Sequence, residues 1–513
     1  MARAPWESVP SHEQFFVLIT GANSGVGLGI GQRLIDEFLH QRPLTHHLIL
    51  LPTTRSPSKS RETILALRRH LEKTARTSGN LRSRSGGEEN YIWPQTFRRV
   101  HILSPQLDLV DIKSVYGFAE RLVRGTVSNP PDEDGMADNL TDVRVPRLDA
   151  VIFNAGFGGW DGLDWFGMAR MCLFEGVVQA VTWPDFKVSS AGAVVKQKGV
   201  VKKSAGKESG SAAGEKDGDK DVLGAVFCSN VFGHYVLGHA LLPLLARRDG
   251  DIMSPGKIIW TSSIEPSRKD LHLDDLQCIK RPSAYESSKR LTDVLALTCT
   301  LPSVFPVSKN YFRLPSRRRH RDNDDQAKQE EEGDVVEECY RPRVYLTHPG
   351  VLATTLFPLP SWLFLLYRFA LLFVRWLGSP WHTVDGYAAA VAPVTLTLET
   401  QDVLDEEHAE RVKWGSACNR FGRTAAKKTE VDGWGWEGKI EGDVRRAKTV
   451  KGEEGFLRKS VGRWAYAKDL TEEDRAQFEG VGRECWAAME RLRLEWEERL
   501  GVKAVGLVED DEE

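Results

Sequence analysis

The chain has 513 residues, of which 41% are hydrophobic and 27% are charged, and these proportions are ordinary for a globular protein. Its 69 basic and 72 acidic residues leave a net charge of −3, which argues against nucleic acid as a partner. The 7 cysteines show no CxxC pair and no metal-ligand spacing, so neither a disulfide framework nor a metal site is predicted.

Short apolar runs of strand length alternate along the chain with segments of helical periodicity. The runs lie at 15–20, 47–51, 100–103, 149–154, 257–262 and 343–348. Apolar residues at three- and four-residue spacing occur at 29–40, 62–73, 112–123, 230–248 and 285–298. Strands that are apolar on both faces and alternate with helices predict an α/β fold, a doubly wound parallel sheet covered by helices on both sides.

Three polar segments interrupt this pattern, at 74–90, 188–221 and 314–334. They are rich in charge, glycine or serine and too poor in apolar residues to offset the entropy of ordering, so mobile surface insertions are predicted there. We expect one catalytic domain over 1–400. The remainder, 401–513, is expected to be a C-terminal extension of unknown role.

A glycine-rich turn follows the first predicted strand and leads directly into a helical segment. Its residues are Thr20, Gly21, Ala22, Asn23, Ser24, Gly25, Val26 and Gly27. Glycine lets the chain turn tightly and lets a phosphate approach backbone N–H groups at a helix N-terminus, where the helix dipole favours negative charge. Glycine-rich turns often have a purely structural role, but the position of this turn between a strand and a helix predicts a dinucleotide site.

The end of the second predicted strand distinguishes between the two nicotinamide dinucleotides. A carboxylate there would accept hydrogen bonds from a free ribose 2′-OH and would repel a 2′-phosphate. The sequence LLPTTRSPSK contains no acid at this point, whereas Arg55 can bind a phosphate through two hydrogen bonds, with Ser56 and Lys59 nearby. NADP(H) is therefore predicted over NAD(H), and the alternative for Arg55 is a solvated loop residue.

Tyr285 and Lys289 stand four residues apart, which places both side chains on one face of a helix. A carbonyl that accepts hydride also needs a proton, and a nearby ammonium should lower the tyrosine pKa from its ordinary value of about 10. The strand at 257–262 brings Ser262 and Ser263 to the carboxyl end of the sheet, where a hydroxyl can stabilise charge on a substrate oxygen. Alone, the Tyr–Lys spacing also occurs by chance between two surface residues of a helix. Together with the serines, it predicts a reacting centre.

Six motifs follow one another along the chain: TGxxxGxG at 20–27, NAG at 154–156, Asn230, TSS at 261–263, YxxxK at 285–289 and Pro349-Gly350. This series resembles the short-chain dehydrogenase/reductase family, whose fold is of the Rossmann type. One departure is the gap of about twenty residues between Ser263 and Tyr285, which is longer than usual in the family. A substrate-facing insertion at 265–280 is expected to fill it.

The resemblance implies a dinucleotide site that extends well beyond the glycine-rich turn. It assigns to the cofactor Asp108, Asn154, Ala155, Gly156, Tyr285, Lys289, Pro349, Gly350 and Thr354. In the family the aspartate contacts the adenine, the NAG motif lies beside the adenosine, and the PGxxxT turn packs along the nicotinamide. For Asp108 an ordinary role as a helix N-terminal acid remains the alternative.

The resemblance also implies the catalytic roles. Tyr285 would supply the proton, Ser263 would position the substrate oxygen with Ser262 as the alternative, and Lys289 would tune the tyrosine while holding ribose hydroxyls. Asn230 would hold a water that links the lysine to solvent; its alternative role is a helix cap, and the two roles are compatible.

Within the family, the phrases TGANSGVG, HPGVLATTLF and LGSPWHTVDGYAAAVAPV are most similar to the fungal 3-keto-steroid reductases. That likeness covers roughly residues 13–415 and implies NADPH-dependent reduction of a sterol 3-ketone during C4 demethylation. It further implies the cytoplasmic face of the endoplasmic reticulum membrane, or lipid droplets, and the other C4-demethylation enzymes as partners.

The segment 359–378 is strongly apolar and nearly long enough to span a bilayer. Arg368 and Arg375 interrupt it about two helical turns apart, so both guanidinium groups fall on one face. Such a helix suits the membrane interface, with the arginines reaching the headgroups and aromatic residues such as Phe373 and Trp376 among the acyl chains. A lid helix packed over the substrate pocket is the alternative.

Two other functions remain open from the sequence. The same machinery could serve a reductase of retinoids or other lipophilic carbonyls, which only substrate profiling would separate. A non-catalytic nucleotide-binding scaffold in a membrane complex is the rival of a different class. The presence of Ser263, Tyr285 and Lys289 argues against it.

Overall fold

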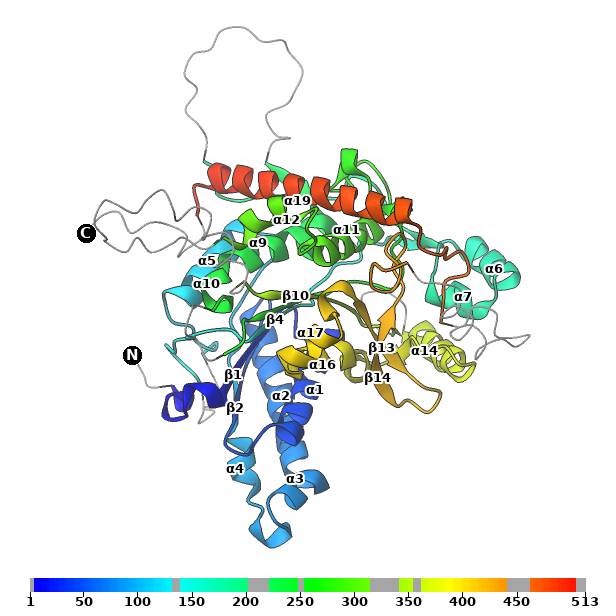
Figure 1. Cartoon of the computed structure of the whole chain (residues 1–513). Helices are drawn as coiled ribbons and strands as arrows, with labels where there is room; N and C mark the ends of the chain where they lie inside the picture. Colours follow the sequence, from blue (N-terminus) through cyan, green and yellow to red (C-terminus); the bar gives the residue numbers. More distant parts are fainter. Residues whose placement is uncertain are drawn as a thin grey trace, which may run out of the picture.

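An eight-stranded, mostly parallel sheet forms the centre of the protein (Figure 1). The computed structural model describes residues 4–131, 139–201, 221–247, 253–313, 341–353, 361–440 and 462–503. In spatial order the strands are β14 (Thr424–Thr429), β13 (Lys413–Cys418), β10 (Arg343–His348), β9 (Lys257–Thr261), β4 (Ala150–Phe153), β1 (Gln14–Ile19), β2 (His47–Pro52) and β3 (Val100–Ile102). All neighbouring pairs are parallel except β13 and β14, which are antiparallel.

The order of the strands confirms the predicted doubly wound fold. The six runs predicted as strands form β1, β2, β3, β4, β9 and β10. The chain leaves β1 towards β2 and β3 on one side and continues from β4 towards β13 on the other, so the order reverses between β1 and β4. In such sheets ligands bind at the carboxyl ends of the strands beside this reversal.

Two helical layers cover the sheet and enclose two separate apolar cores. The layer of the first core contains α5 (Ile112–Val123), α9 (Gly233–Ala240), α11 (Ala284–Thr298) and α19 (Glu472–Leu500). That of the second contains α1 (Gly25–Gln41), α2 (Pro57–Thr77), α15 (Gly386–Ala389) and α16 (Val391–Leu398). Residues along β1 alternate between the cores, Phe16 and Leu18 in one, Val17 and Ile19 in the other, because successive side chains of a strand point to opposite faces.

Shorter elements connect these layers. The helices are α3 (Gly79–Arg84), α4 (Trp93–Phe97), α6 (Trp165–Phe174), α7 (Val177–Thr182), α8 (Ala225–Phe227), α10 (Leu242–Leu245), α12 (Phe305–Ser308), α14 (Ser361–Trp376) and α17 (Gln401–Glu406). Three two-stranded sheets pair β5 (Gly162–Leu163) with β6 (Lys187–Val188), β7 (Val194–Lys196) with β8 (Val222–Gly224), and β11 (Val351–Leu352) with β12 (His382–Val384).

The expected domain boundary at residue 400 does not divide the sheet. The strand β13 pairs with β10 along Leu346–Lys413 to His348–Gly415, and β14 extends the sheet beyond it. These strands escaped the sequence analysis because they are rich in small and charged residues and lack an apolar run. Residues 413–429 are therefore part of the same sheet as the predicted site.

The long C-terminal helix α19 lies along α11, which carries Tyr285 and Lys289 (Figure 1). Gly482 permits this close packing, since a Cβ there would lie 2.7 Å from Oγ1 of Thr298. Further along, the Tyr235 hydroxyl donates a hydrogen bond to Glu490 at 3.1 Å. The end of the extension thus supports the helix of the predicted reacting centre.

The prediction of a mobile insertion at 74–90 is wrong over most of this segment, which is helical. The helix α2 continues to Thr77, and α3 follows directly. Leu81 is fully buried, and the Tyr91 hydroxyl donates a hydrogen bond to the carbonyl of Ala75 at 2.6 Å. A few buried anchors thus order a segment whose average composition is polar.

The other two predicted insertions lie partly or wholly outside the described residues. Of 188–221, the residues 202–220 are not described, while β7 is paired with β8. Gln197 joins this hairpin to the start of α5, because its side chain accepts the N–H of Ile112 at 3.0 Å and donates to the carbonyl of Val110 at 2.9 Å. The segment 314–334 lies entirely outside the described residues.

The predicted apolar helix at 359–378 is α14, and residues 354–360 before it are not described. Its face towards the protein packs on α7, where Val374 and Val178 are buried together. Within the described ranges, no helix combines the length and apolarity needed to cross a membrane.

Candidate active site

The glycine-rich turn between β1 and α1 is shaped by backbone geometry that side chains would disrupt. Gly21 and Gly25 have φ values of 66° and 54°, in the left-handed region that favours glycine. A Cβ on Gly27 would lie 2.2 Å from the carbonyl oxygen of Gly21. Ser24 precedes α1 in an extended conformation without capping it, and Asn23 donates to the Ser24 hydroxyl at 3.4 Å.

Thr20 connects this turn to the NAG motif at the end of β4. Its buried hydroxyl accepts the backbone N–H groups of Asn154 at 2.9 Å and Ala155 at 3.1 Å. In return, the Asn154 amide donates to the carbonyls of Thr20 at 3.1 Å and Gly21 at 3.3 Å. The two turns predicted to bind the nucleotide therefore form one hydrogen-bonded unit.

Arg55 follows strand β2, and Asp108 follows the neighbouring strand β3. Arg55 is exposed immediately after β2, and Ser56 caps α2 by accepting the Lys59 N–H at 3.4 Å. Asp108 is half-buried and accepts the backbone N–H of Val110 at 3.3 Å, so it also stabilises the turn before α5. The described structure provides a basic group and no carboxylate at the end of β2, as NADP(H) would require.

Tyr285 and Lys289 lie one helical turn apart near the start of α11. The Lys289 Nζ is 5.7 Å from the centre of the Tyr285 ring and donates to the carbonyl of Thr261 at 2.8 Å. Burial lowers the pKa of Lys289 to about 8. The indole of Trp160 packs against the tyrosine ring, with 4.6 Å between ring centres.

The structure distinguishes between the two candidate serines. The side chain of Ser263 lies close enough to the Tyr285 hydroxyl to act to lower the tyrosine pKa. Ser262 is buried, and its hydroxyl instead donates to the backbone carbonyl of Lys289 at 3.2 Å. Ser263 is therefore the serine placed to meet a substrate oxygen at Tyr285.

Asn230 lies in a π-helical turn, Cys228–Phe232, between α8 and α9. Its side chain accepts the N–H of Phe157 at 2.7 Å and donates to the Ser288 hydroxyl at 3.0 Å. The alternative role as a helix cap is wrong, because the helical segment already begins at Ala225. π-Helical turns of this kind are frequent at functional sites.

Gly156 is the point at which the NAG turn meets the catalytic residues. A Cβ on Gly156 would lie 3.5 Å from Oδ1 of Asn230 and 3.9 Å from Nζ of Lys289. The predicted nucleotide-binding turn and the predicted catalytic residues thus form one site at the carboxyl edge of the sheet.

Lys187, Glu265 and Glu286 form a charged cluster beside Tyr285 that the sequence analysis missed. Lys187 forms ion pairs with Glu265 and, at 3.1 Å, with Glu286. Its Nζ is 5.3 Å from the Tyr285 ring centre, slightly closer than that of Lys289. Lys187 lay at the edge of a predicted insertion, and no local motif marks it.

This cluster changes the electrostatics expected at Tyr285. Burial and then the negative charge of Glu265 raise the pKa of Tyr285 above its ordinary value of 10, while Lys187 acts in the opposite direction. The expectation that the neighbouring ammonium of Lys289 gives a net lowering is therefore wrong. On α14, burial and the negative charge of Glu265 also raise the pKa of Tyr367 to about 12.

The predicted nicotinamide turn follows β10. Gly350 has a φ of 73°, and a Cβ on it would lie 2.3 Å from the carbonyl of Trp381. The carbonyl of Pro349 accepts a hydrogen bond from the Thr383 hydroxyl at 3.0 Å. Thr354, predicted to belong to the same turn, lies outside the described residues.

Comparison with solved structures gives only distant likenesses. A 3-oxoacyl-[acyl-carrier protein] reductase from Brucella melitensis in complex with NAD is 11% identical, covering 75% of this chain and 89% of its own, with a TM-score of 0.34. Salutaridine reductase from Papaver somniferum is 13% identical over 67% of this chain and 88% of its own, with a TM-score of 0.28. The fold rests on the strand order described above.

Comparison with curated proteins gives nearly full-length relatives. The chain is 48% identical to the 3-keto-steroid reductase ERG27 of Gibberella zeae, over 98% of both chains. It is 39% identical to the 3-keto-steroid reductase erg27 of Aspergillus fumigatus, over 94% of both. No protein-family model matches the chain. The protein belongs to the 3-keto-steroid reductase family of oxidoreductases.

Proposed function

We propose that the protein reduces the 3-ketone of a sterol to the 3-hydroxyl with NADPH, during C4 demethylation in sterol biosynthesis. The observation that carries the substrate is the identity to the Gibberella zeae 3-keto-steroid reductase along almost the whole chain. The chemistry is supported by the convergence of Tyr285, Ser263, Lys289 and Asn230 at one edge of the sheet.

The residues of the site suit the reductive direction. When held by the glycine-rich turn, NADPH would provide the hydride for the carbonyl carbon. Tyr285 donates the proton to the oxygen, and its raised pKa keeps it protonated at neutral pH, as a general acid must be. Ser263 positions the oxygen and stabilises its developing charge. Lys289, charged below its pKa of about 8, provides the positive charge next to the tyrosine.

Asn230 supports the reacting centre through its hydrogen bonds to Phe157 and Ser288. By bonding both Phe157 and Ser288, it fixes the segment after the NAG motif against α11. It is the residue through which we expect Lys289 to exchange protons with solvent. The dinucleotide is assigned as NADP(H) because Gly21, Gly25 and Gly27 keep side chains away from the turn that would receive its phosphates, and because the basic, exposed Arg55 follows β2.

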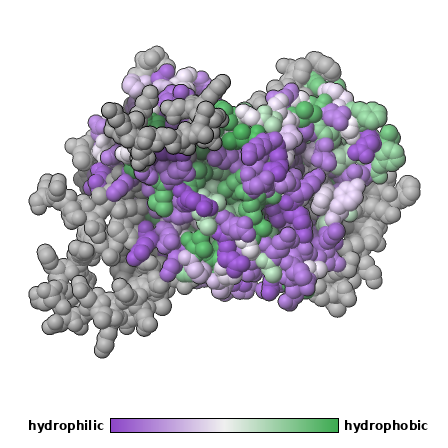
Figure 2. All heavy atoms as spheres, turned by 90° about the horizontal axis from the view of Figure 1, so that it is seen from above, coloured by the Kyte–Doolittle hydropathy of each residue, from purple (hydrophilic) through white to green (hydrophobic). Residues whose placement is uncertain are grey.

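An apolar cap lies beside the site and suits a water-insoluble substrate. We define the cap as α6, α7 and α14. The large apolar side chains that it exposes are Trp165, Phe166, Leu173, Phe174, Leu365, Leu366, Phe369, Phe373 and Trp376. Figure 2 shows hydrophobic residues gathered at the end of the molecule where Figure 1 places α6 and α7. Exposed apolar surface on this scale is typical of membrane- or partner-binding sites.

The cap supports attachment to a membrane through residues 359–378. On α14, Leu366, Phe369, Phe373 and Trp376 recur at three- and four-residue spacing and are all more than half exposed. A sterol could then enter from the lipid without crossing water. Placement at the cytoplasmic face of the endoplasmic reticulum or on lipid droplets, near other C4-demethylation enzymes, belongs to this proposal.

The proposed function is tested by NADPH oxidation with purified protein in detergent. A 3-keto sterol, retinal and the variant Tyr285→Phe are compared in parallel. We expect oxidation with the sterol only and a loss of about 10²–10⁴-fold or more in the variant, which lacks the proton donor. NADPH binding by the variant should remain unchanged.

Each other outcome selects a different function. Activity with retinal alone would retain the mechanism and contradict the sterol substrate. NADPH binding without turnover of either compound would favour the non-catalytic scaffold, as would a Tyr285→Phe variant that complements a reductase-deficient cell.

A further inference from the structure

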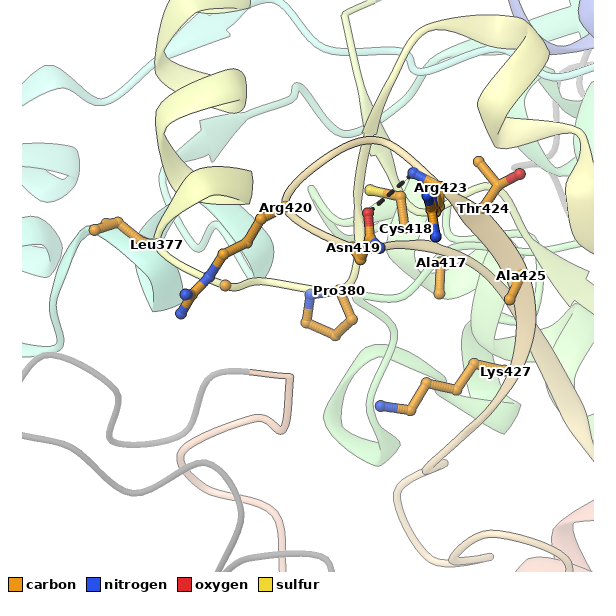
Figure 3. Close-up of a pocket in the computed structure, with 11 residues that line it drawn as sticks. Leu377, Pro380, Ala417, Cys418, Asn419, Arg420, Arg423, Thr424, Ala425 and Lys427 are labelled. Carbon is orange, nitrogen blue, oxygen red and sulfur yellow. Dashed lines mark hydrogen bonds between the residues drawn. The ribbon is translucent and has the colours of Figure 1, made fainter.

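A basic pocket of about 530 Å³ lies between the C-terminal end of α14 and the hairpin that joins β13 to β14 (Figure 3). Arg420, Arg423 and Lys427 line it, and none of its lining residues is acidic. It lies beyond Trp381, on the far side of the turn at Gly350. None of the residues assigned to the reductase site lines it.

The three cations of this pocket are exposed and have no carboxylate partner among the described residues. An anion that entered the pocket would lie in the combined positive field of these side chains, and a phosphate there can accept charge-assisted hydrogen bonds from a guanidinium group.

The hairpin is held in a defined shape. The Asn419 side chain accepts the backbone N–H groups of Phe421 and Arg423, each at 3.0 Å, and the backbone N–H of Asn419 donates to the carbonyl of Arg423 at 2.9 Å. The guanidinium of Arg420 lies over Gly378, where a Cβ would be 3.1 Å from it. The hairpin backbone is therefore held by hydrogen bonds at Asn419, and Arg420 is in contact with the chain just after α14.

Apolar residues flank the pocket on the same edge. Phe421, at the tip of the hairpin, is 90% exposed, and Trp376, at the end of α14, is 66% exposed. Gly422 next to the tip lies close to Arg375 of α14, so hairpin and helix end are in contact. A site for a soluble anion gains nothing from an exposed phenylalanine, whereas a site at a bilayer gains both contacts.

We propose that this pocket binds the phosphate of an anionic phospholipid headgroup, while Phe421 and the exposed stripe of α14 enter the lipid. The proposal rests on the membrane attachment proposed above and gives it a specific lipid contact. Juxtaposed basic and aromatic groups of this kind combine electrostatic attraction with apolar burial at an anionic surface.

The test is co-sedimentation of the full chain with vesicles of phosphatidylcholine, alone or mixed with phosphatidylinositol. We expect the wild type to bind the mixed vesicles at least tenfold more tightly. Arg420→Gln/Arg423→Gln should lose this preference and bind neutral vesicles as the wild type does. Phe421→Ser should weaken binding to both.

A charge-matched control separates a site from overall charge. Arg69 and Lys73 are exposed on α2, which lies well apart from α14 in Figure 1. The variant Arg69→Gln/Lys73→Gln removes the same charge and should keep the full preference. Thermal unfolding of each variant checks that it is folded.

Three results would overturn the proposal. The first is an equal loss of preference in both double variants. The second is a preference for mixed vesicles that survives in Arg420→Gln/Arg423→Gln. The third is release of the wild type by millimolar inorganic phosphate at constant ionic strength, which would indicate a site for free anions. A fourth result, in which the wild type binds neutral and mixed vesicles equally well, would contradict the proposed headgroup site and leave the proposed membrane attachment standing. Reduction of a detergent-dispersed 3-keto sterol is measured separately, so failure of the proposed reductase function is recognised independently.

Discussion

The carboxyl edge of the sheet and the apolar cap lie next to each other but are built in opposite ways. At the sheet edge, the polar groups of Thr20, Asn154 and Asn230 are each held by two or more hydrogen bonds. In the cap, Phe166 and Leu173 are both 82% exposed. The interior of the site is complete within the chain, whereas the cap leaves apolar surface uncovered.

This difference separates two requirements of the proposed reaction. Proton and hydride transfer need atoms fixed to within a fraction of an ångström, and a dense hydrogen-bond network gives that precision. Uptake of a sterol from lipid needs apolar surface in contact with lipid, and fixed geometry matters less there. The predictions below test this division, first at the sheet and last at the cap.

The largest effect is expected from the buried ion pair between Lys413 of β13 and Asp293 of α11. The two side chains are 2% and 0% exposed, and Nζ lies 2.6 Å from the carboxylate. Lys413→Met would leave Asp293 buried without its cation and should lower the free energy of unfolding by about 3–5 kcal/mol. Urea denaturation measures this change.

The matched control is Lys428→Met, in the neighbouring strand. Lys428 is 35% exposed and pairs with Glu437 at 3.2 Å, so its loss should cost less than about 1 kcal/mol. Equal costs for the two variants would contradict the conclusion that β13 is integral to the catalytic unit.

Gly27→Ala should break the nucleotide-binding turn. The added Cβ would lie 2.2 Å from the carbonyl of Gly21 and 2.6 Å from the amide of Asn154, so the turn must move. We expect a destabilisation of about 1–3 kcal/mol and at least a tenfold rise in the dissociation constant for NADPH, measured by fluorescence titration. Gly79→Ala, where no atom lies within 4 Å of the new Cβ, is the control and should leave binding unchanged.

The pH dependence of reduction should follow Lys289. Its pKa is lowered to about 8, so the ammonium is present below pH 8 and is lost as the pH rises through that value. We therefore expect kcat/KM to fall about tenfold per pH unit above pH 8. Lys289→Arg keeps the charge and should be slower but lack this decline; a decline that persists in the variant would assign it to another group.

The smallest effect on stability is expected in the cap. Phe166→Ser and Leu173→Ser replace exposed side chains and should change the free energy of unfolding by less than about 0.5 kcal/mol. Val374→Ala, buried between α14 and α7, should cost roughly 2 kcal/mol. If the exposed pair proved as costly as Val374, the cap would be a covered core and not an open apolar surface.

The sequence by itself determined those features that depend on local periodicity. Strands buried on both faces appear in the sequence as apolar runs, so β1, β2, β3, β4, β9 and β10 were predicted correctly. A spacing of four residues places Tyr285 and Lys289 on one face of a helix, and Gly21 and Gly25 follow from the first turn's need for positive φ. The segment 74–90 was misjudged because its average composition is polar although single residues such as Leu81 anchor it.

Only the tertiary structure decided the features that depend on residues distant in the chain. The strand β13 contains small and charged residues, and its pairing with β10 makes it a strand. Lys187 reaches Tyr285 because β6 pairs with β5, and no sequence spacing encodes that proximity. The raised pKa of Tyr285 likewise reflects burial and the approach of Glu265. Periodicity is written in neighbouring residues, whereas burial and charge contact arise only when separate segments pack together.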